Sequence, residues 1–186
     1  MPASTPVNTL AARLGTTTHV SALLRKARKA GLVTPDDLSN LAAQRGCRHY
    51  WHDGVPEGEL ATREQLSDEE LAIALLNVAL PFDPHAIRCG AAMVSAEGNS
   101  PKRLAWLAKL ERSERVLRYV AECGKKYEPE NAFWDELLAL LPVFPPLPDG
   151  ALPHPTRFIS MTGYVRGVGP KIVTQWERPR KRRIAA

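Results

Sequence analysis

The chain has 186 residues, 44% of them hydrophobic, and a formal net charge of +5. This length fits one domain with tails, and the hydrophobic share suffices for a core, which excludes a chain that is disordered throughout. No run of about 18 apolar residues occurs, and residues 1–9 lack the charged and apolar regions of a secretory signal. We therefore expect a cytoplasmic protein without membrane contact.

The charge falls into three blocks. Residues 1–33 carry five basic and no acidic side chains, residues 34–150 carry 12 basic and 19 acidic ones, and residues 151–186 carry eight basic ones against Glu177. An acidic middle between two basic ends predicts an anionic partner, with nucleic acid as the first choice. A basic tail that serves only solubility is the alternative.

The first two predicted helices form a hairpin. Residues 1–16 show no helical period, and we expect a flexible segment there. From residue 18 to residue 30, apolar side chains recur at the spacing of one helix face and basic side chains fill the rest. Thr34-Pro35-Asp36-Asp37 then predicts the start of a helix over 35–45, because it combines a cap, a first-turn proline and acids at the positive helix end.

This hairpin has the outline of a DNA-binding helix-turn-helix. The second helix would have to read bases, yet it begins with Asp36 and Asp37, whose carboxylates phosphates would repel. The charge pattern therefore favours an ordinary helical hairpin.

Further helices follow a loop over residues 46–66. Ser67 and Glu70 have the spacing of a capping box, and the stretch 71–80 after them is apolar nearly all round. A helix of that kind is buried, so we expect it at the centre of the core. Helical periods also predict helices over 85–96, 102–123 and 131–141.

The predicted helix 102–123 has one apolar and one basic side. Glu111–Arg115 and Glu114–Arg118 have the spacing of helical ion pairs. This pattern favours a solvated face with local ion pairs over a phosphate-binding groove.

The composition changes after residue 141. Six prolines within residues 142–155 exclude a regular helix or sheet and predict an extended arm that packs across the helices. Residues 157–161 and 171–176 resemble short strands around a glycine-rich turn, which predicts a small hairpin.

These elements predict a mainly α fold, a compact bundle of about six helices arranged as helical hairpins, with a Pro-rich extended arm and a small C-terminal β-hairpin. The expected divisions are a flexible segment over 1–16, a helical core over 17–141, the arm and hairpin over 142–176, and a basic tail over 177–186.

The loop after residue 46 holds the densest group of metal-binding residue types. Cys47, His49 and His52 are weak metal-ligand candidates, since zinc accepts sulfur and nitrogen donors. A closed zinc site usually combines two ligand clusters, and the remaining histidines and cysteines are scattered. A hydrogen-bonded polar loop is therefore favoured, and we expect no metal or other cofactor.

No catalytic pattern emerges from the sequence. Gly163–Gly169 lacks the strand, helix and lysine of a phosphate-binding loop, and no Gly-x-Ser-x-Gly occurs. Three cysteines at wide spacing fit reduced thiols, and Cys89 and Cys123 lie within predicted helices, where a buried structural thiol is usual. These observations argue against an enzyme.

Two basic segments are candidate nucleic-acid-binding surfaces. In the C-terminal segment, Tyr164 and Trp176 interleave with cations, so aromatic rings offer stacking surfaces for bases while the cations neutralise phosphates. The candidate residues of both segments are Arg25, Lys26, Arg28, Lys29, Arg166, Lys171, Trp176, Arg178, Arg180, Lys181, Arg182 and Arg183.

Three functional hypotheses follow. The first is a non-enzymatic accessory or adaptor protein that contacts DNA or RNA through its basic termini, as a subunit of a larger nucleoprotein assembly. The second is a protein–protein adaptor that uses the Pro-rich arm with Phe144 and Leu147. The third is a metal-dependent enzyme that uses Cys47, His49 and His52. The high usage of Ala, Arg, Leu and Pro is typical of GC-rich bacterial genomes.

Overall fold

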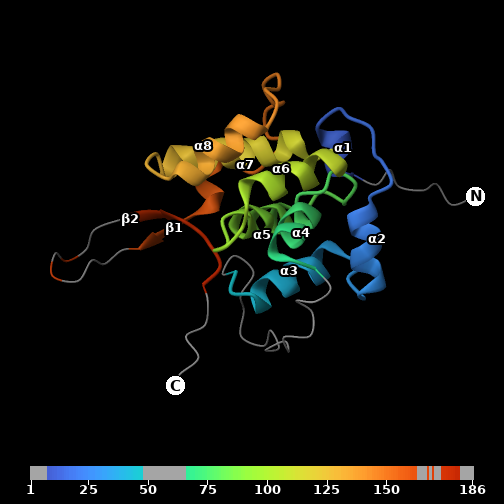
Figure 1. The fold of residues 1–186 in the computed structure, drawn as a ribbon, viewed down its shortest axis with the longest axis horizontal. Coiled ribbons are helices and arrows are strands. Elements are labelled where there is room, and N and C mark those ends of the chain that lie inside the picture. The colour runs from blue at the N-terminus through green and yellow to red at the C-terminus, as the bar shows by residue number, and fades with distance from the viewer. Residues whose placement is uncertain (1–7, 48–65, 163–166, 168, 170–172, 181–186) are drawn as a thin grey trace, which may run out of the picture.

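The fold is mainly helical, as predicted, with a small antiparallel sheet near the C-terminus (Figure 1). The computed structural model describes residues 8–47, 66–162, 167, 169 and 173–180. The helices and strands within these ranges are α1 (Leu10–Arg13), α2 (Ala22–Lys29), α3 (Pro35–Gln44), α4 (Asp68–Leu75), α5 (Pro84–Val94), α6 (Pro101–Leu110), α7 (Glu114–Tyr127), α8 (Ala132–Leu140), the 3-10 helix η3 (Pro155–Phe158), β1 (Ile159–Thr162) and β2 (Val173–Trp176).

Helix α4 lies at the centre of the core, as its apolar sequence predicted. Its residues 71–75 are each at most 1% exposed, and it packs against α2, α3, α5 and α6. Figure 1 shows α3 on one side of the α4–α5 pair and α6, α7 and α8 on the other. The helix ends at Leu75 rather than at residue 80, because the Asn77 side chain accepts a bond from the N–H of Ala79 at 3.0 Å and stabilises a turn there.

Helix starts follow the capping residues of the sequence. Thr34 and Ser67 each form a complete capping box, and the side chains of Asp83 and Asn131 accept bonds from the first turns of α5 and α8. The caps predicted at Thr34 and Ser67 are confirmed, because a cap depends on neighbours within the same turn.

The prediction of one helix over 102–123 is wrong. α6 ends at Leu110 and α7 begins at Glu114, and Arg112 between them has the left-handed φ of 52°. The N–H of Ser113 donates to the carbonyl of Ala108 at 2.8 Å and closes the corner. The chain turns here because the Glu111 side chain is buried in the core, where it accepts a hydrogen bond from the start of α2.

Glu111 is 4% exposed and joins the corner to the start of α2. Its carboxylate accepts hydrogen bonds from the hydroxyl of Ser21, from the N–H of Leu23 at 2.9 Å and from Asn77 Nδ2 at 3.0 Å. His19 Nε2 lies 3.6 Å from the same carboxylate. The predicted Glu111–Arg115 pair is therefore replaced by a buried network that fixes α2 beside the end of α6.

Helix α1 was not predicted. Leu10, Ala11 and Leu14 are each at most 4% exposed, and the N–H groups of Leu10 and Ala11 donate to the carbonyls of Leu80 and Val78. No helical period is visible here because the helix spans barely one turn. The expected flexible segment over 1–16 thus includes residues that contribute to the core.

The Pro-rich segment forms an extended arm that packs across the helices, as expected. Proline lacks an N–H but keeps its carbonyl, and side chains of α7 donate to these carbonyls. Arg115 bonds to the carbonyls of Pro145 and Pro146 at 3.3 and 3.2 Å, and Tyr119 bonds to that of Pro153 at 2.7 Å. Ala151 and Leu152 at the end of the arm are buried.

The two strands pair antiparallel, with Ile159 opposite Trp176 and Thr162 opposite Val173, which confirms the predicted hairpin. Trp176 is 1% exposed, and its ring centroid lies 5.1 Å from that of Trp134 on α8. Its Nε1–H donates to Ser95 Oγ at 3.0 Å. The hairpin is therefore attached to the helices by its last aromatic residue.

Residues 177–180 continue from β2 along the core. The N–H of Glu177 donates to the carbonyl of Phe158, Arg178 Nη2 lies 2.7 Å from Glu128 Oε2, and the N–H of Arg180 donates to the carbonyl of Gly46 at 3.1 Å. Gly46 permits this contact, because a Cβ there would lie 2.2 Å from the Arg180 carbonyl oxygen. The boundary expected at residue 177 thus lies in a segment that contacts the core.

Candidate functional site

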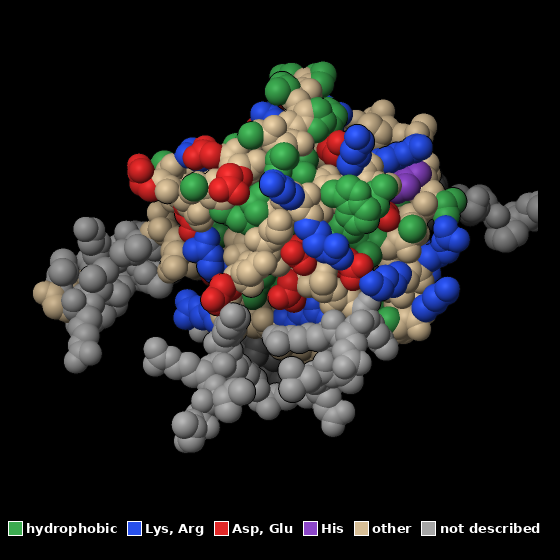
Figure 2. All heavy atoms as spheres, viewed as in Figure 1, with side chains coloured by type: hydrophobic (Ala, Val, Ile, Leu, Met, Phe, Trp, Pro, Cys, Tyr) green, Lys and Arg blue, Asp and Glu red, His purple; other side chains and the backbone are tan. Residues whose placement is uncertain are grey.

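Helix α2 presents three cations on one exposed face. Leu23, Leu24 and Ala27 face the core, so the outer face carries Arg25, Arg28 and Lys29 at the spacing i, i+3, i+4. No ion pair joins these three side chains to any residue that the structure describes. In Figure 2, Lys and Arg side chains gather at the α2 end of the molecule.

Lys26, the fourth candidate on α2, has a different role. Its Nζ lies 2.7 Å from Glu70 Oε1 at the start of α4, and Arg103 Nη2 of α6 lies 4.0 Å from the same oxygen. Burial alone would raise the pKa of Glu70, but the hydrogen bond from Lys26 and the other donors outweigh it and hold the pKa below 4.5. Glu70 therefore stays ionised and links the surfaces of α2 and α6.

Helix α6 carries an exposed tryptophan that was not among the candidate residues predicted from the sequence. Trp106 is 54% exposed, whereas Trp134 and Trp176 are at most 1% exposed. Its neighbours one turn away are Lys102, Arg103 and Lys109, all exposed. The sequence could have indicated that Trp106 is exposed, because position 106 lies outside the apolar stripe formed by Leu104, Leu107 and Ala108.

Trp176 cannot serve as a nucleic-acid-binding residue, contrary to the prediction. Its ring lies in the core, where no base can stack on it, because the hairpin packs this side of β2 against α8. Arg178 is held by Glu128, while Arg180 is exposed. The other candidates of this segment lie outside the described residues: Arg166, Lys171, Lys181, Arg182 and Arg183.

The two arginines of α7 bind groups within the protein. Arg118 pairs with Glu122 at 2.9 Å and donates to the carbonyls of Leu138 and Leu141. Arg115 binds the arm and the carbonyl of Leu14. The predicted Glu114–Arg118 pair is thus replaced by the Arg118–Glu122 pair. The basic side chains of 102–123 therefore serve two purposes: those of α6 are exposed to solvent, and the arginines of α7 bind other parts of the fold.

The cysteines are buried. Cys47 and Cys89 are at most 1% exposed, and the hydrogen bond to Cys47 together with burial raises the pKa of Cys89 far above its usual range. Burial raises the pKa of Cys123 to about 12. All three are free thiols, and Cys89 and Cys123 have the structural role that was predicted.

The weak metal candidates are divided between the described and undescribed parts of the chain. Cys47 is buried, and His49 and His52 lie outside the described residues. Within residues 8–47, 66–162 and 173–180, no three Cys, His, Asp or Glu side chains come together as a metal site. No described helix is both long and apolar enough to cross a membrane.

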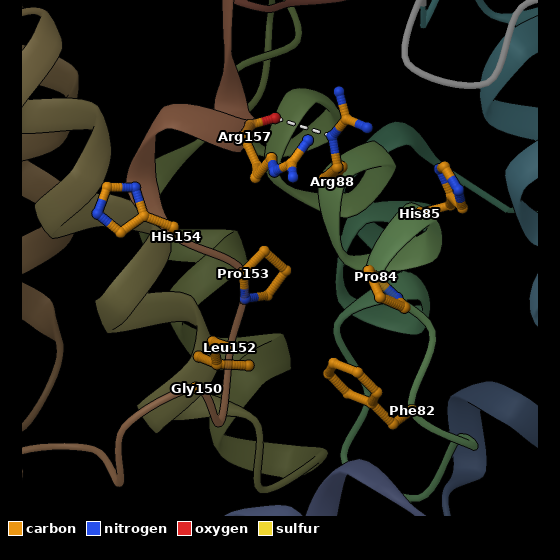
Figure 3. Close-up of a pocket in the computed structure, with 9 residues that line it drawn as sticks. All are labelled: Phe82, Pro84, His85, Arg88, Gly150, Leu152, Pro153, His154 and Arg157. Atoms are coloured by element: carbon orange, nitrogen blue, oxygen red, sulfur yellow. Dashed lines mark hydrogen bonds between the residues drawn. The ribbon is translucent and has the colours of Figure 1, made fainter.

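A cleft of about 340 Å³ lies between the first half of α5 and the segment 150–157 (Figure 3). Arg88 and Arg157 lie together at one end, where Arg88 Nε donates to the carbonyl of Arg157 at 2.8 Å. His85 and His154 lie on opposite sides and do not converge. The lining residues are Phe82, Pro84, His85, Arg88, Gly150, Leu152, Pro153, His154 and Arg157. The lining contains no Ser, Thr, Cys, Asp or Glu, and its two imidazoles do not face one another.

Comparison with known protein families, curated proteins and solved structures finds no match to this chain.

The structure brings only part of the sequence-predicted basic set together. Arg180 meets Gly46 just beyond the C-terminal end of α3, whereas α2 precedes the start of α3. A helix of 10 residues is about 15 Å long, so α3 separates Arg180 from the residues that precede its start. Lys26 of α2 and Arg103 of α6 meet at Glu70, so exposed cations of α2 and α6 lie on either side of this carboxylate. The outer surfaces of these two helices are called the α2–α6 face.

Proposed function

We propose that this protein binds nucleic acid through the α2–α6 face and serves as a non-enzymatic accessory subunit of a larger nucleoprotein assembly. The observation that carries this proposal is the row of Arg25, Arg28 and Lys29, which are exposed, adjacent and without an ion-pair partner among the described residues. Phosphates would supply the missing counter-charges.

The folding of α2 does not account for this row. Like charges at i, i+4 spacing destabilise a helix by about 0.2–0.5 kcal/mol per pair. Arg28 and Lys29 lie in the last turn, where the helix dipole favours cations, but Arg25 lies outside that turn. A binding partner explains the presence of all three cations, whereas the helix dipole explains two.

A protein–protein adaptor is the second candidate, and a different surface favours it. Leu140 and Val143, where α8 leads into the Pro-rich arm, are 46% and 81% exposed. An adaptor would use these side chains, together with the adjacent Pro-rich arm, as its apolar contact with another protein. A protein partner that stays bound after nuclease treatment, and that is lost on Val143→Asp, would favour this function.

Salt-dependent binding tests the nucleic-acid proposal. We expect the purified full chain to bind a labelled RNA or DNA oligonucleotide at about 50 mM salt, with affinity that falls steeply towards about 200 mM. The double variant Arg25→Gln/Arg28→Gln should lower the slope of log K against log salt by about one to two.

The matched control removes the same charge elsewhere. Lys126→Gln/Arg157→Gln replaces two exposed cations of α7 and η3, and we expect its affinity and salt slope to equal those of the unmodified chain. Absence of binding at low salt, or equal losses in both double variants, would contradict a site on α2.

A further inference from the structure

Trp106 is placed on α6 as a surface residue. The helix packs through Leu104, Leu107 and Ala108, which are at most 6% exposed, so the core does not need the indole. The ring itself is 54% exposed. A half-exposed tryptophan among cations is an amphipathic surface suited to a planar, anionic partner.

The charges around the ring are unevenly neutralised. Arg103 lies 3.9 Å from Glu69 and 4.0 Å from Glu70, so these two carboxylates are engaged by cations. Lys102 and Lys109 are exposed and form no ion pair with the described residues. Glu111, the next acid along the chain, is buried in its network with Ser21. The ring therefore lies between two lysines whose charges are available to phosphate groups.

We infer that Trp106 is a base-stacking site and that the nucleic acid bound on the α2–α6 face is single-stranded. This inference rests on the proposed function and adds the class of ligand to it. An unpaired base stacks on the indole while its flanking phosphates contact Lys102 and Lys109. In a duplex the base faces are already covered by neighbouring bases, so an aromatic ring on a convex helix surface cannot reach them.

The strand can continue from α6 to α2. Lys26 and Arg103 meet at Glu70, and Ser21 and Leu23 are bonded to Glu111 at the end of α6. These two links hold α2 beside the end of α6, so one extended strand can contact both helices. The face thus combines an exposed aromatic ring, on which a base can stack, with cations that contact the phosphates. Proteins that bind single-stranded nucleic acid combine these two features.

A protein partner is the rival occupant of this surface. Val20 and Leu110 are 80% and 57% exposed, and Leu110 lies one turn from Trp106. Together they offer apolar contact, but the cations Lys102, Arg103 and Lys109 border the indole itself. This charge pattern favours the nucleic acid, and the experiment below includes the protein as an outcome that overturns the inference.

The test compares single- and double-stranded oligonucleotides of about 12 nucleotides, labelled and titrated with the full chain. We expect Trp106→Leu to weaken single-strand binding about 5- to 100-fold and duplex binding by less, because stacking is lost while the phosphate contacts remain. Trp106→Phe should retain most of the affinity, since an aromatic face is kept. Leu110→Ala is the matched control on the same face, and it should bind as the unmodified chain does.

Fluorescence gives a second readout. Binding of the unlabelled single strand should quench tryptophan emission in the unmodified chain, and the quench should disappear in Trp106→Phe. If Trp106→Leu does not fold, as judged by circular dichroism, the Phe variant and its lost quench still test the inference.

Comparison with the α2 variant separates this inference from the proposed function. If Arg25→Gln/Arg28→Gln loses binding while Trp106→Leu binds the single strand normally, the proposed function stands and the stacking site is overturned. If no oligonucleotide binds at low salt, both fail. A protein partner that is lost on Trp106→Leu, with no oligonucleotide bound, would assign the face to protein docking and would overturn the inference.

Discussion

At the scale of single residues, Glu128 is the clearest case of one side chain that joins separate elements. Its Oε2 accepts bonds from Trp134 Nε1 at 2.8 Å, from Asn131 Nδ2 at 3.0 Å and from Arg178 at 2.7 Å. Burial raises the pKa of Glu128, but these donors outweigh it and hold the pKa below its ordinary value of 4.5. The ionised carboxylate thus stabilises the attachment of residues 177–180 to α8.

Glu128→Gln should lower the free energy of unfolding by about 1–2 kcal/mol at neutral pH, because charge-assisted bonds become neutral ones. Since the folded pKa is depressed, this contribution is present above the unfolded pKa near 4.5 and is lost as the pH falls through the lower folded value. Chemical denaturation from pH 7 down to pH 3 measures it.

The exposed Glu122→Gln serves as the control, and its stability should change by less than about 0.5 kcal/mol. A difference between the unmodified chain and Glu128→Gln that stays constant down to pH 3 would contradict the role of the Glu128 charge.

Gly124 shows how a small residue positions a large one. A Cβ at this position of α7 would lie 2.4 Å from the Trp134 ring, so the absence of a side chain allows the indole to lie against the helix. Trp134 in turn contacts Trp176 edge to face. The burial of Trp176, which removed it from the nucleic-acid candidates, therefore depends in part on a glycine elsewhere in the chain.

At the scale of elements, α7 holds the Pro-rich arm through side-chain donors. A proline-rich strand cannot pair with a sheet, but its carbonyls accept bonds from planar guanidinium groups that reach more than one acceptor. Arg115 reaches the carbonyls of Leu14, Pro145 and Pro146, so it joins the α1 region to the arm.

Arg115→Lys should loosen the arm. A single ammonium group cannot replace the planar fork that reaches these carbonyls, so we expect faster cleavage within residues 142–153 and a loss of about 1–2 kcal/mol in the free energy of unfolding. Limited proteolysis followed by mass spectrometry measures the first effect. Arg112→Lys, the same exchange at an exposed position of the corner, should leave both unchanged, and equal cleavage of the two variants would argue against arginine-mediated docking.

At the scale of the whole molecule, residues 177–180 connect three parts of the fold. Glu177 bonds to the end of η3, Arg178 to Glu128 after α7, and Arg180 to Gly46 after α3. Removal of residues 177–186 would therefore take away contacts of the folded core together with the basic charge.

We expect a chain that ends at Trp176 to have a Tm lower by about 5–10 °C, since two backbone hydrogen bonds and the Arg178–Glu128 pair are lost. The triple variant Lys181→Gln/Arg182→Gln/Arg183→Gln removes charge and keeps residues 177–180, and its Tm should equal that of the unmodified chain. Thermal unfolding followed by circular dichroism compares them. Equal Tm values for the truncated and full chains would show that residues 177–180 contribute nothing to stability.

The helical class, the start of several helices and the terminal hairpin could all be predicted from local patterns in the sequence. Thr34 and Ser67 were recognisable as caps because each side chain bonds within its own first turn. The apolar pattern of α4 also specified its burial, since a helix without a polar face has to be enclosed. In each case the deciding interaction lies within a few residues of the chain.

Tertiary structure alone decided where the charged and aromatic side chains are used. Glu111 bonds to α2 rather than to Arg115, so one predicted helix became two, and Arg115 and Arg118 became donors to the arm and to α8. Trp176 entered the core while Trp106 stayed outside it. A long side chain can form equally favourable contacts with several of its sequence neighbours. Which partner it binds depends on groups that folding brings near from distant positions in the sequence.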